Sequence, residues 1–272
     1  MDRWADKMRE KNYSLLLGTS ITTIVVLLIL LGFFWKPYNP NALNPAMKTM
    51  PPSLAHIMGT DNFGRDIFSR VLAGAGTTLT IAARIVAVGT IVGVLAGSIT
   101  GYFGGIADEI LMRICDTMTA FPSILLALVV ISFIGPGTNS LIIAMGLLFI
   151  PSFTRIVRAE YARQRNLDYV TSARLMGCSH ARILYVHILP NIKPVLLSSI
   201  AIGFNNAVLA EASMSFLGLG VQRPDASLGS MLSDSQALMI SAPWYMIFSG
   251  AAISALILGF GLLSDGLRDR ES

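Results

Sequence analysis

The segment DYVTSARLMGCSHARILYVHILPN, residues 168–191, lies between two strongly apolar runs and is itself polar and basic. Either Asn166 or Asp168 can cap a first short helix at its start, because both side chains accept hydrogen bonds from free backbone N–H groups. Gly177 is expected to end that helix, and Ser179 to cap a second one. The pattern predicts two short helices outside a membrane, which is more structure than a simple reversal of the chain requires.

Helical spacing places Tyr169, Ala173 and Met176 on one face of the first helix. The same spacing aligns Ile183, Val186 and His187 on the second helix, which Pro190 and Pro194 are expected to end. We interpret the segment as a docking site for a cytoplasmic protein, the alternative being a solvated connecting loop. The residues expected at this coupling site are Asp168, Tyr169, Ala173, Arg174, Met176, Gly177, Arg182, Ile183, Leu189 and Pro190.

The composition favours a membrane protein. Of the 272 residues, 53% are hydrophobic and only 13% are charged, and the mean hydropathy is +0.64. Soluble domains carry about 25% charged residues. The first uncharged run, from Asn12 to Trp35, is long enough to cross a bilayer. A secretory signal is the alternative, but no small-residue cleavage site follows the run, so we expect an uncleaved anchor.

Uncharged runs of spanning length predict an all-α integral membrane protein with six transmembrane helices. A cytoplasmic coupling helix is expected between the fourth and fifth spans. The N-terminal part, 1–76, would hold a cytoplasmic tail, the first span and an outer loop. The remainder, 77–272, would form a five-helix core containing the coupling loop 160–193. The expected spans are 13–35, 77–103, 110–134, 139–158, 194–219 and 243–264.

The basic residues indicate the orientation of these spans. Lys and Arg concentrate before the first span, in 155–193 and after the last span, whereas few occur in 36–76 and 220–242. Short cytoplasmic loops carry the excess of basic residues. We therefore expect both termini in the cytoplasm. The net charge of +4 then reflects membrane topology, and a nucleic-acid partner is excluded.

Small residues and prolines mark contacts and bends within the spans. In the second span a glycine recurs at every fourth position, which lets another helix approach closely. Pro122 and Pro151 are expected to kink the third and fourth spans. The helix-packing seam consists of Gly89, Gly93, Gly97 and Gly101.

Two features near the membrane surfaces have mainly structural interpretations. In 59–70, Thr60 or Asp61 can cap a short amphipathic helix that lies flat on the outer surface. Arg113 and Asp116 lie three residues apart near the inner end of the third span and are expected to pair.

Polar side chains within spans are expensive in lipid and usually face the interior of a helix bundle. We hypothesise that Glu211 lines a translocation path, with interhelical hydrogen bonding as the alternative. The candidate path residues are Asn205, Asn206, Glu211, Ser213 and Ser215 in the fifth span and Arg84 in the second.

We recognise no catalytic or metal-binding motif in the sequence. It has no phosphate-binding glycine loop followed by Lys and Ser or Thr, so we expect no nucleotide hydrolysis. Three dispersed histidines form no metal-ligand spacing with cysteine or acidic residues. Cys115 and Cys178 are expected to be free thiols. We expect a non-enzyme with no bound metal or cofactor.

The segment at 171–190 resembles the "EAA" loop of binding-protein-dependent ABC importer permeases. The loop's first triplet is Thr171-Ser172-Ala173 here, and Gly177 and Leu189-Pro190 follow at the expected distances, with His187 in the place of an isoleucine. The leading Glu and Ala are absent, so contacts of that glutamate do not transfer. Further matches make the chain similar to the "C" permease subunit of dipeptide, oligopeptide and nickel importers: Gly59-Thr60-Asp61, Gly64-Arg65-Asp66, Ser69-Arg70, Phe121-Pro122, Glu211-Ala212-Ser213, Ser215 to Gly220, Pro243-Trp244 and Gly266-Leu267-Arg268-Asp269.

The resemblance implies a permease subunit of a bacterial inner-membrane importer. It would pair with a homologous second permease, two cytoplasmic ATP-binding subunits that use ATP and Mg²⁺, and an extracytoplasmic substrate-binding protein. Peptides and nickel or metal-chelate complexes are the implied cargoes, with peptides favoured. An ion-coupled secondary transporter is a more distant alternative, because we find neither repeat symmetry nor intramembrane carboxylates beyond Glu211.

Overall fold

The computed structural model describes residues 34–271 and, before them, residues 19, 20, 22–24, 27, 30 and 32; side chains are described as far as Ser264. Most of the predicted first span, 13–35, therefore lies outside the described residues. The described chain is all-α, with no strand beyond one isolated bridge between Thr60 and Asp66. The predicted all-α fold class is confirmed.

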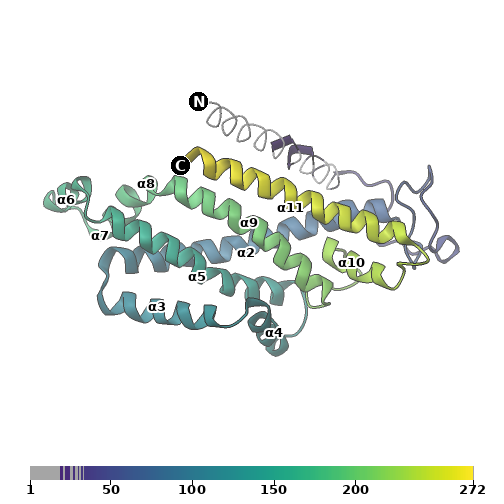
Figure 1. Ribbon diagram of the computed structural model, residues 1–272, viewed down its shortest axis with the longest axis horizontal. Coiled ribbons are helices and arrows are strands. Elements are labelled where there is room, and N and C mark those ends of the chain that lie inside the picture. The colour runs from purple at the N-terminus through teal and green to yellow at the C-terminus, as the bar shows by residue number, and fades with distance from the viewer. Residues whose placement is uncertain are drawn as a thin grey trace, which may run out of the picture.

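The molecule is elongated, with long helices running along its length (Figure 1). Short helices α6, α7 and α8 lie at one end, and α10 lies toward the other together with the loop that precedes α2. The elements are η1 (Pro45–Met47), α2 (Ile67–Phe103), α3 (Gly105–Ala120), α4 (Ser123–Ile134), α5 (Thr138–Gln164), α6 (Asp168–Leu175), α7 (His180–Arg182), the π-helix η2 (Ile183–Ile188), α8 (Leu189–Asn191), α9 (Lys193–Phe216), α10 (Leu228–Gln236) and α11 (Pro243–Glu271).

Four of the described helices, α2, α5, α9 and α11, are long and apolar enough to cross a membrane. The bent pair of α3 and α4 makes a fifth if it counts as one span. These elements correspond to five of the six predicted spans. Hydropathy located α5, α9 and α11 well, because each contains a continuous apolar run.

Helices α2 and α5 form the most extensive helix pair of the fold. The glycine seam of α2 packs directly against α5. A Cβ at Gly89 would lie 2.7 Å from Cβ of Phe149, and one at Gly97 would lie 2.6 Å from the carbonyl oxygen of Thr154. Such separations are too short for any side chain, so the absence of side chains along this stripe allows the close contact.

The third predicted span is broken more sharply than a kink. Helix α3 ends at Ala120, α4 starts at Ser123, and the two axes differ by 94°. Phe121 and Pro122 adopt extended backbone between them, since a proline lacks the N–H that would continue the helix. By contrast, Pro151 lies inside α5, which continues to Gln164.

The predictions for the start of the second span were wrong. Helix α2 begins at Ile67 rather than at residue 77, because the Asp66 carboxylate caps it by accepting a hydrogen bond from Ser69 N (2.7 Å). The separate surface helix expected within 59–70 does not exist. Its later residues form the first turn of α2, and Arg70 is 1% exposed.

Buried side chains form two clusters. The larger one joins α2, α4, α5, α9, α10 and α11 along the bundle. The smaller one lies at the α6 end, and we call it the base cluster; it consists of Tyr102, Val157, Tyr161, Val170, Ala173, Ile183, Leu184, Ile188 and Ile192. A separate core at this end means that the short helices are packed onto α2 and α5 as a folded unit.

Candidate functional site

Residues 168–191, which we call the coupling segment, fold as two short helical pieces around a glycine turn. Gly177 has a positive φ of 78°, which ends α6. The Ser179 hydroxyl then accepts a hydrogen bond from Arg182 N (3.4 Å) and caps the next helix. The N-cap of α6 is Leu167 rather than Asn166 or Asp168. Asp168 instead lies in the first turn, where its charge favours the helix dipole.

The second piece is longer than the sequence suggested. Pro190 was expected to end it, but the helical backbone runs on through η2 and α8 to Asn191. The π-helical turn accounts for this, because Leu189 N bonds to Leu184 O five residues back. A wider turn relieves the clash of the proline ring with the carbonyl four residues earlier and needs no donor from Pro190.

Hydrogen bonds fix the coupling segment to α5. The Tyr161 hydroxyl donates to Leu184 O (2.9 Å), and the Tyr169 hydroxyl donates to Gln164 Oε1 (2.9 Å). Burial raises the pKa of the Tyr169 hydroxyl, and a hydrogen bond with Asn191 opposes that change. Tyr169 therefore keeps its proton and can act as a donor in this bond.

The predicted contact residues divide between the two sides of the segment. Ala173 and Ile183 are 2% and 0% exposed and belong to the base cluster, so they face the protein's own core. Met176 is 77% exposed at the tip, and so is its neighbour Leu175 (84%), which the sequence analysis did not single out. Tyr169 and Leu189 are half-buried, while the remaining predicted residues are exposed: Asp168, Arg174, Gly177, Arg182 and Pro190.

The structure does not bring the six candidate path residues together. Asn206 is exposed on α9 and lines a cavity of about 380 Å³ with Phe149 and Ser152 of α5. Arg84 is exposed on α2 and lines a different cavity of about 320 Å³. Asn205 is half-buried and lies toward α11, since a Cβ at Gly261 would be 3.4 Å from its side-chain nitrogen.

Glu211 lies in the protein interior with 0% exposure. The Ser215 hydroxyl donates to Glu211 Oε1 (2.7 Å), and Val221 N donates to that same hydroxyl oxygen (3.3 Å). The hydroxyls of Thr78 and Ser227 also face the carboxyl group. Glu211 thus lies on α9 facing α2 and the start of α10, and its second oxygen, Oε2, has no hydrogen-bond partner among the described residues. Ser213 is half-buried on α9, and its hydroxyl donates to Leu209 O (2.8 Å).

Salt bridges connect α3 to α5 near the α6 end. Arg158 donates to Asp108 through Nε (2.7 Å) and NH2, and Arg155 NH2 donates to Asp116 Oδ1 (2.8 Å). The predicted pairing of Arg113 with Asp116 is wrong, because Asp116 points across to α5. Sequence spacing favoured the neighbour on the same helix and could not show the closer approach of another helix.

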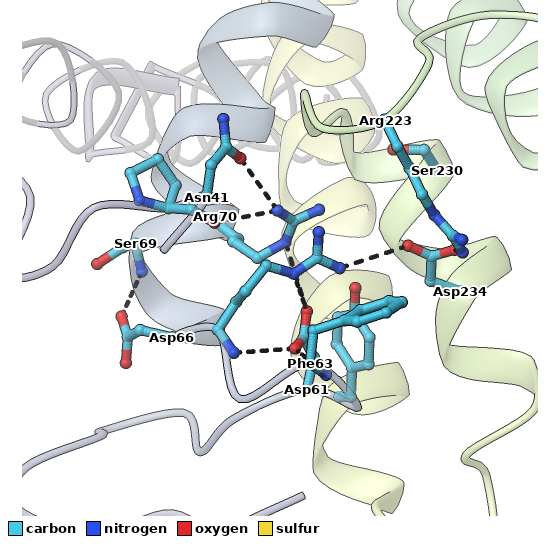
Figure 2. A network of polar contacts seen from close by, with 12 residues as sticks. Asn41, Asp61, Phe63, Asp66, Ser69, Arg70, Arg223, Ser230 and Asp234 are labelled. Carbon is cyan, nitrogen blue, oxygen red and sulfur yellow. Dashed lines mark hydrogen bonds and ion pairs between the residues drawn. The ribbon is translucent and has the colours of Figure 1, made fainter. Parts of the chain in front are cut away.

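A network of buried charges at the α10 end was missed from the sequence (Figure 2). Asp61 is 0% exposed, and its carboxylate accepts hydrogen bonds from Phe63 N (2.8 Å), Arg65 N (2.9 Å) and Arg65 Nε (2.6 Å). Arg70 Nε lies 3.8 Å from the same carboxylate. Arg70 also donates to Pro40 O (3.0 Å). Asp61 therefore holds two buried guanidinium groups.

The network extends to α10. Arg65 NH2 lies 4.0 Å from Asp234 Oδ2, and Arg223 NH2 donates to Asp234 Oδ1. That bond and the charge of Asp234 raise the pKa of Arg223. Figure 2 shows Arg223 and Asp234 converging from the loop and from α10, beside Asp61 and Arg70. The network thus ties the loop before α2 to α10. The sequence pattern that could have indicated this network is the clustering of Asp and Arg residues in 61–70.

We expect Asp61→Asn to destabilise the protein by about 3–5 kcal/mol, because removing one partner leaves buried charges uncompensated. The measurement is thermal unfolding of the purified protein in detergent. Asp225→Asn is the control, since Asp225 is exposed in the nearby loop. Equal unfolding temperatures for the two variants would contradict the role assigned to this network.

The described residues contain no group of three or more His, Cys, Asp or Glu able to hold a metal ion. Cys115 is buried and Cys178 is partly exposed, and both are free.

Comparisons with known proteins agree with this architecture. A family model described as "Binding-protein-dependent transport system inner membrane component" matches residues 93–270. The chain is 38% identical to "Dipeptide transport system permease protein DppC" of Alkalihalophilus pseudofirmus, covering 98% of this chain and 88% of that protein. It is 39% identical to "Glutathione transport system permease protein GsiD" of Pectobacterium atrosepticum, covering 90% and 83%.

A solved structure shares the fold. It shows inward-facing conformations of the MetNI methionine ABC transporter, with a TM-score of 0.60 and 20% identity, covering 74% of this chain and 95% of that chain. The family model spans more than half of the chain, and the relatives match nearly all of it. The chain therefore belongs to the family of binding-protein-dependent transport system inner membrane components, the multi-pass permease subunits of ABC importers.

Proposed function

We propose that this chain forms half of the translocation pathway for short peptides in an ATP-driven importer. Two relatives support peptides as cargo, since their names describe dipeptide and glutathione transport. A homologous permease would supply the other half of the pathway. An extracytoplasmic binding protein would deliver substrate, and two cytoplasmic subunits would bind ATP and Mg²⁺ and hydrolyse the nucleotide.

The exposed tip of the coupling segment carries this proposal. Leu175 and Met176 present apolar side chains at one end of the molecule, at the end of α6, whose Val170 and Ala173 are buried in the base cluster. Exposed apolar side chains on a rigid, protruding unit are typical of a protein contact. The basic residues around the segment favour the cytoplasmic side. We therefore propose that the tip contacts an ATP-binding subunit and that both chain termini are cytoplasmic.

Such a contact suggests how ATP binding drives transport. When the two ATP-binding subunits close, each would push a coupling segment and the helices packed on it. Helices α2 and α5 would move together because of their close packing. A hinge or shear motion of this kind switches a cavity between the two sides of the membrane. The cavity beside Asn206, between α5 and α9, is the candidate path surface.

Glu211 has a different place in this proposal. Its carboxyl group lies between α2, α9 and α10 rather than on the cavity beside Asn206. We propose that it lines the path only in a state in which these three helices have separated. In the arrangement described above, its carboxyl group is buried and accepts a hydrogen bond from Ser215 of the same helix.

The test is substrate uptake into proteoliposomes that contain the complete complex in their membrane, with the binding protein added outside. We expect accumulation of a labelled dipeptide that requires internal ATP, and no accumulation of a nickel chelate. Accumulation of the nickel chelate alone would overturn the assignment of cargo. Uptake driven by a proton or sodium gradient without ATP would overturn the assignment of mechanism.

A further inference from the structure

The contact between α2 and the coupling segment centres on Tyr102. This residue follows the last glycine of the seam and is 4% exposed. Its hydroxyl accepts a hydrogen bond from Arg174 Nε (3.3 Å) and lies 2.9 Å from His180 Nδ1. Arg174 belongs to α6 and His180 to α7. One hydroxyl group therefore joins the end of α2 to both helices of the coupling segment.

The chemistry of the groups fixes one direction in this hydrogen-bond chain. A guanidinium group only donates hydrogen bonds, so the Tyr102 oxygen must accept from Arg174. Between Tyr102 and His180 Nδ1 either group can donate, according to the tautomer of the imidazole ring. In both cases the hydrogen-bond chain runs from Arg174 through Tyr102 to His180.

Aromatic packing supports the same arrangement. The Tyr102 and His180 rings meet edge to face, with centroids 5.6 Å apart. Phe103 packs edge to face against both rings, at 4.9 Å and 5.5 Å. The Arg174 guanidinium carbon lies 5.0 Å from the centre of the Tyr102 ring. These contacts place the hydroxyl and limit the ways in which the ring can move.

The same end of α2 is bound to α5. Arg165 NH1 donates to Gly101 O (3.3 Å), and a Cβ at Gly101 would lie 2.8 Å from Cβ of Tyr161. Tyr161 in turn donates to Leu184 O of the coupling segment (2.9 Å). Helices α2 and α5 thus hold the segment at separate points, and Tyr102 of α2 makes hydrogen bonds to both α6 and α7.

We propose that Tyr102 is a positioning residue for energy coupling, which makes α2 move with the coupling segment when an ATP-binding subunit pushes it. The inference rests on the proposed function, because it assumes that the segment receives that push. Without the hydroxyl, α6 and α7 can tilt relative to α2. Part of the movement is then lost before it reaches the membrane helices.

Tyr102→Phe tests the proposal in the complete complex in proteoliposomes. The ring and its packing remain, but both hydrogen bonds are lost. We expect the amount of peptide transported per ATP hydrolysed to fall by about fivefold or more, while co-purification of the ATP-binding subunits stays unchanged. Tyr185→Phe is the matched control, because Tyr185 is 39% exposed on the same segment. We call the amount of peptide transported per ATP hydrolysed the transport ratio. An unchanged transport ratio in Tyr102→Phe would overturn the proposal.

Substitutions at His180 separate positioning from general stability. Gln can accept a hydrogen bond from the Tyr102 hydroxyl or donate one to it, whereas Leu can do neither. We expect His180→Gln to keep most of the transport ratio and His180→Leu to behave like Tyr102→Phe. The double variant Tyr102→Phe/His180→Leu should be no worse than Tyr102→Phe alone, because Tyr102→Phe already removes the hydrogen bond to His180. Additive losses, or equal losses in Gln and Leu variants, would contradict the hydrogen-bond chain.

The outcome also distinguishes this inference from the proposed function. If charged substitutions at Leu175 and Met176 leave the ATP-binding subunits attached, the docking assignment fails. If those substitutions release the subunits but Tyr102→Phe couples normally, only the role of Tyr102 fails.

Discussion

The double substitution Leu175→Asp/Met176→Asp is expected to release the ATP-binding subunits from the complex. Burying a Leu or Met side chain in an interface contributes roughly 1.5–3 kcal/mol, and each new carboxylate would have to be desolvated at the contact. We expect binding to weaken by about 100-fold or more. The measurement is co-purification of the ATP-binding subunits with the tagged permease. Because both side chains are exposed, the fold should survive.

Ile240→Asp is the control for this experiment. Ile240 is 96% exposed and lies between α10 and α11, away from the coupling segment. The Ile240→Asp substitution also replaces an exposed apolar side chain by aspartate, but it should leave the ATP-binding subunits attached. Equal retention in the double variant and the control would show that the tip is not the docking surface.

Ala173→Asp is also expected to release the ATP-binding subunits from the complex, but for another reason. Ala173 is 2% exposed within the base cluster, so a carboxylate there would be buried without a partner and would disrupt the segment from below. Its effect therefore reports on the folding of the segment rather than on its outer surface.

Gly97→Leu is expected to prevent stable packing of α2 on α5. Even a Cβ at Gly97 would lie 2.6 Å from Thr154 O and 2.9 Å from Cβ of Val157. The obstacle is largely backbone, which cannot rotate away, so the helices must separate. We expect a loss of about 3 kcal/mol or more, the upper range for overpacking. The measurement is the thermal unfolding temperature in detergent, together with the amount of protein in the membrane.

Ala87→Leu provides the comparison for this variant. Ala87 is exposed on the same helix, so the added side chain enters open space. A similar loss of stability in both variants would show that helix composition, rather than the glycine seam, determines the effect.

Local sequence patterns predicted the features that depend on neighbouring residues. Continuous apolar runs located α5, α9 and α11, and the break at Gly177 with the cap at Ser179 follows from backbone conformation and hydrogen bonding. Glycines at every fourth position indicated a packing stripe, although only the structure identifies α5 as the neighbour.

Features that depend on distant residues could not be predicted in this way. Asp61 and Asp234 meet through Arg65, and no spacing rule relates such remote positions. Helix α10 lies in a polar stretch that reads as a loop, although Ser227 and Ser230 form a capping box there. Likewise, the helical spacing of Tyr169, Ala173 and Met176 suggested one face, whereas the base cluster buries Ala173 and leaves Met176 exposed.

Labelling of Cys178 tests most directly whether the coupling segment lies in the cytoplasm. Cys178 is partly exposed, and Cys115 would be replaced by Ser so that only one thiol remains. We expect a membrane-impermeant maleimide to label Cys178 in inside-out vesicles and not in intact cells. Bound ATP-binding subunits should reduce the labelling in vesicles. Labelling from the outside of intact cells would contradict the account, because the segment would then lie out of reach of any cytoplasmic ATPase.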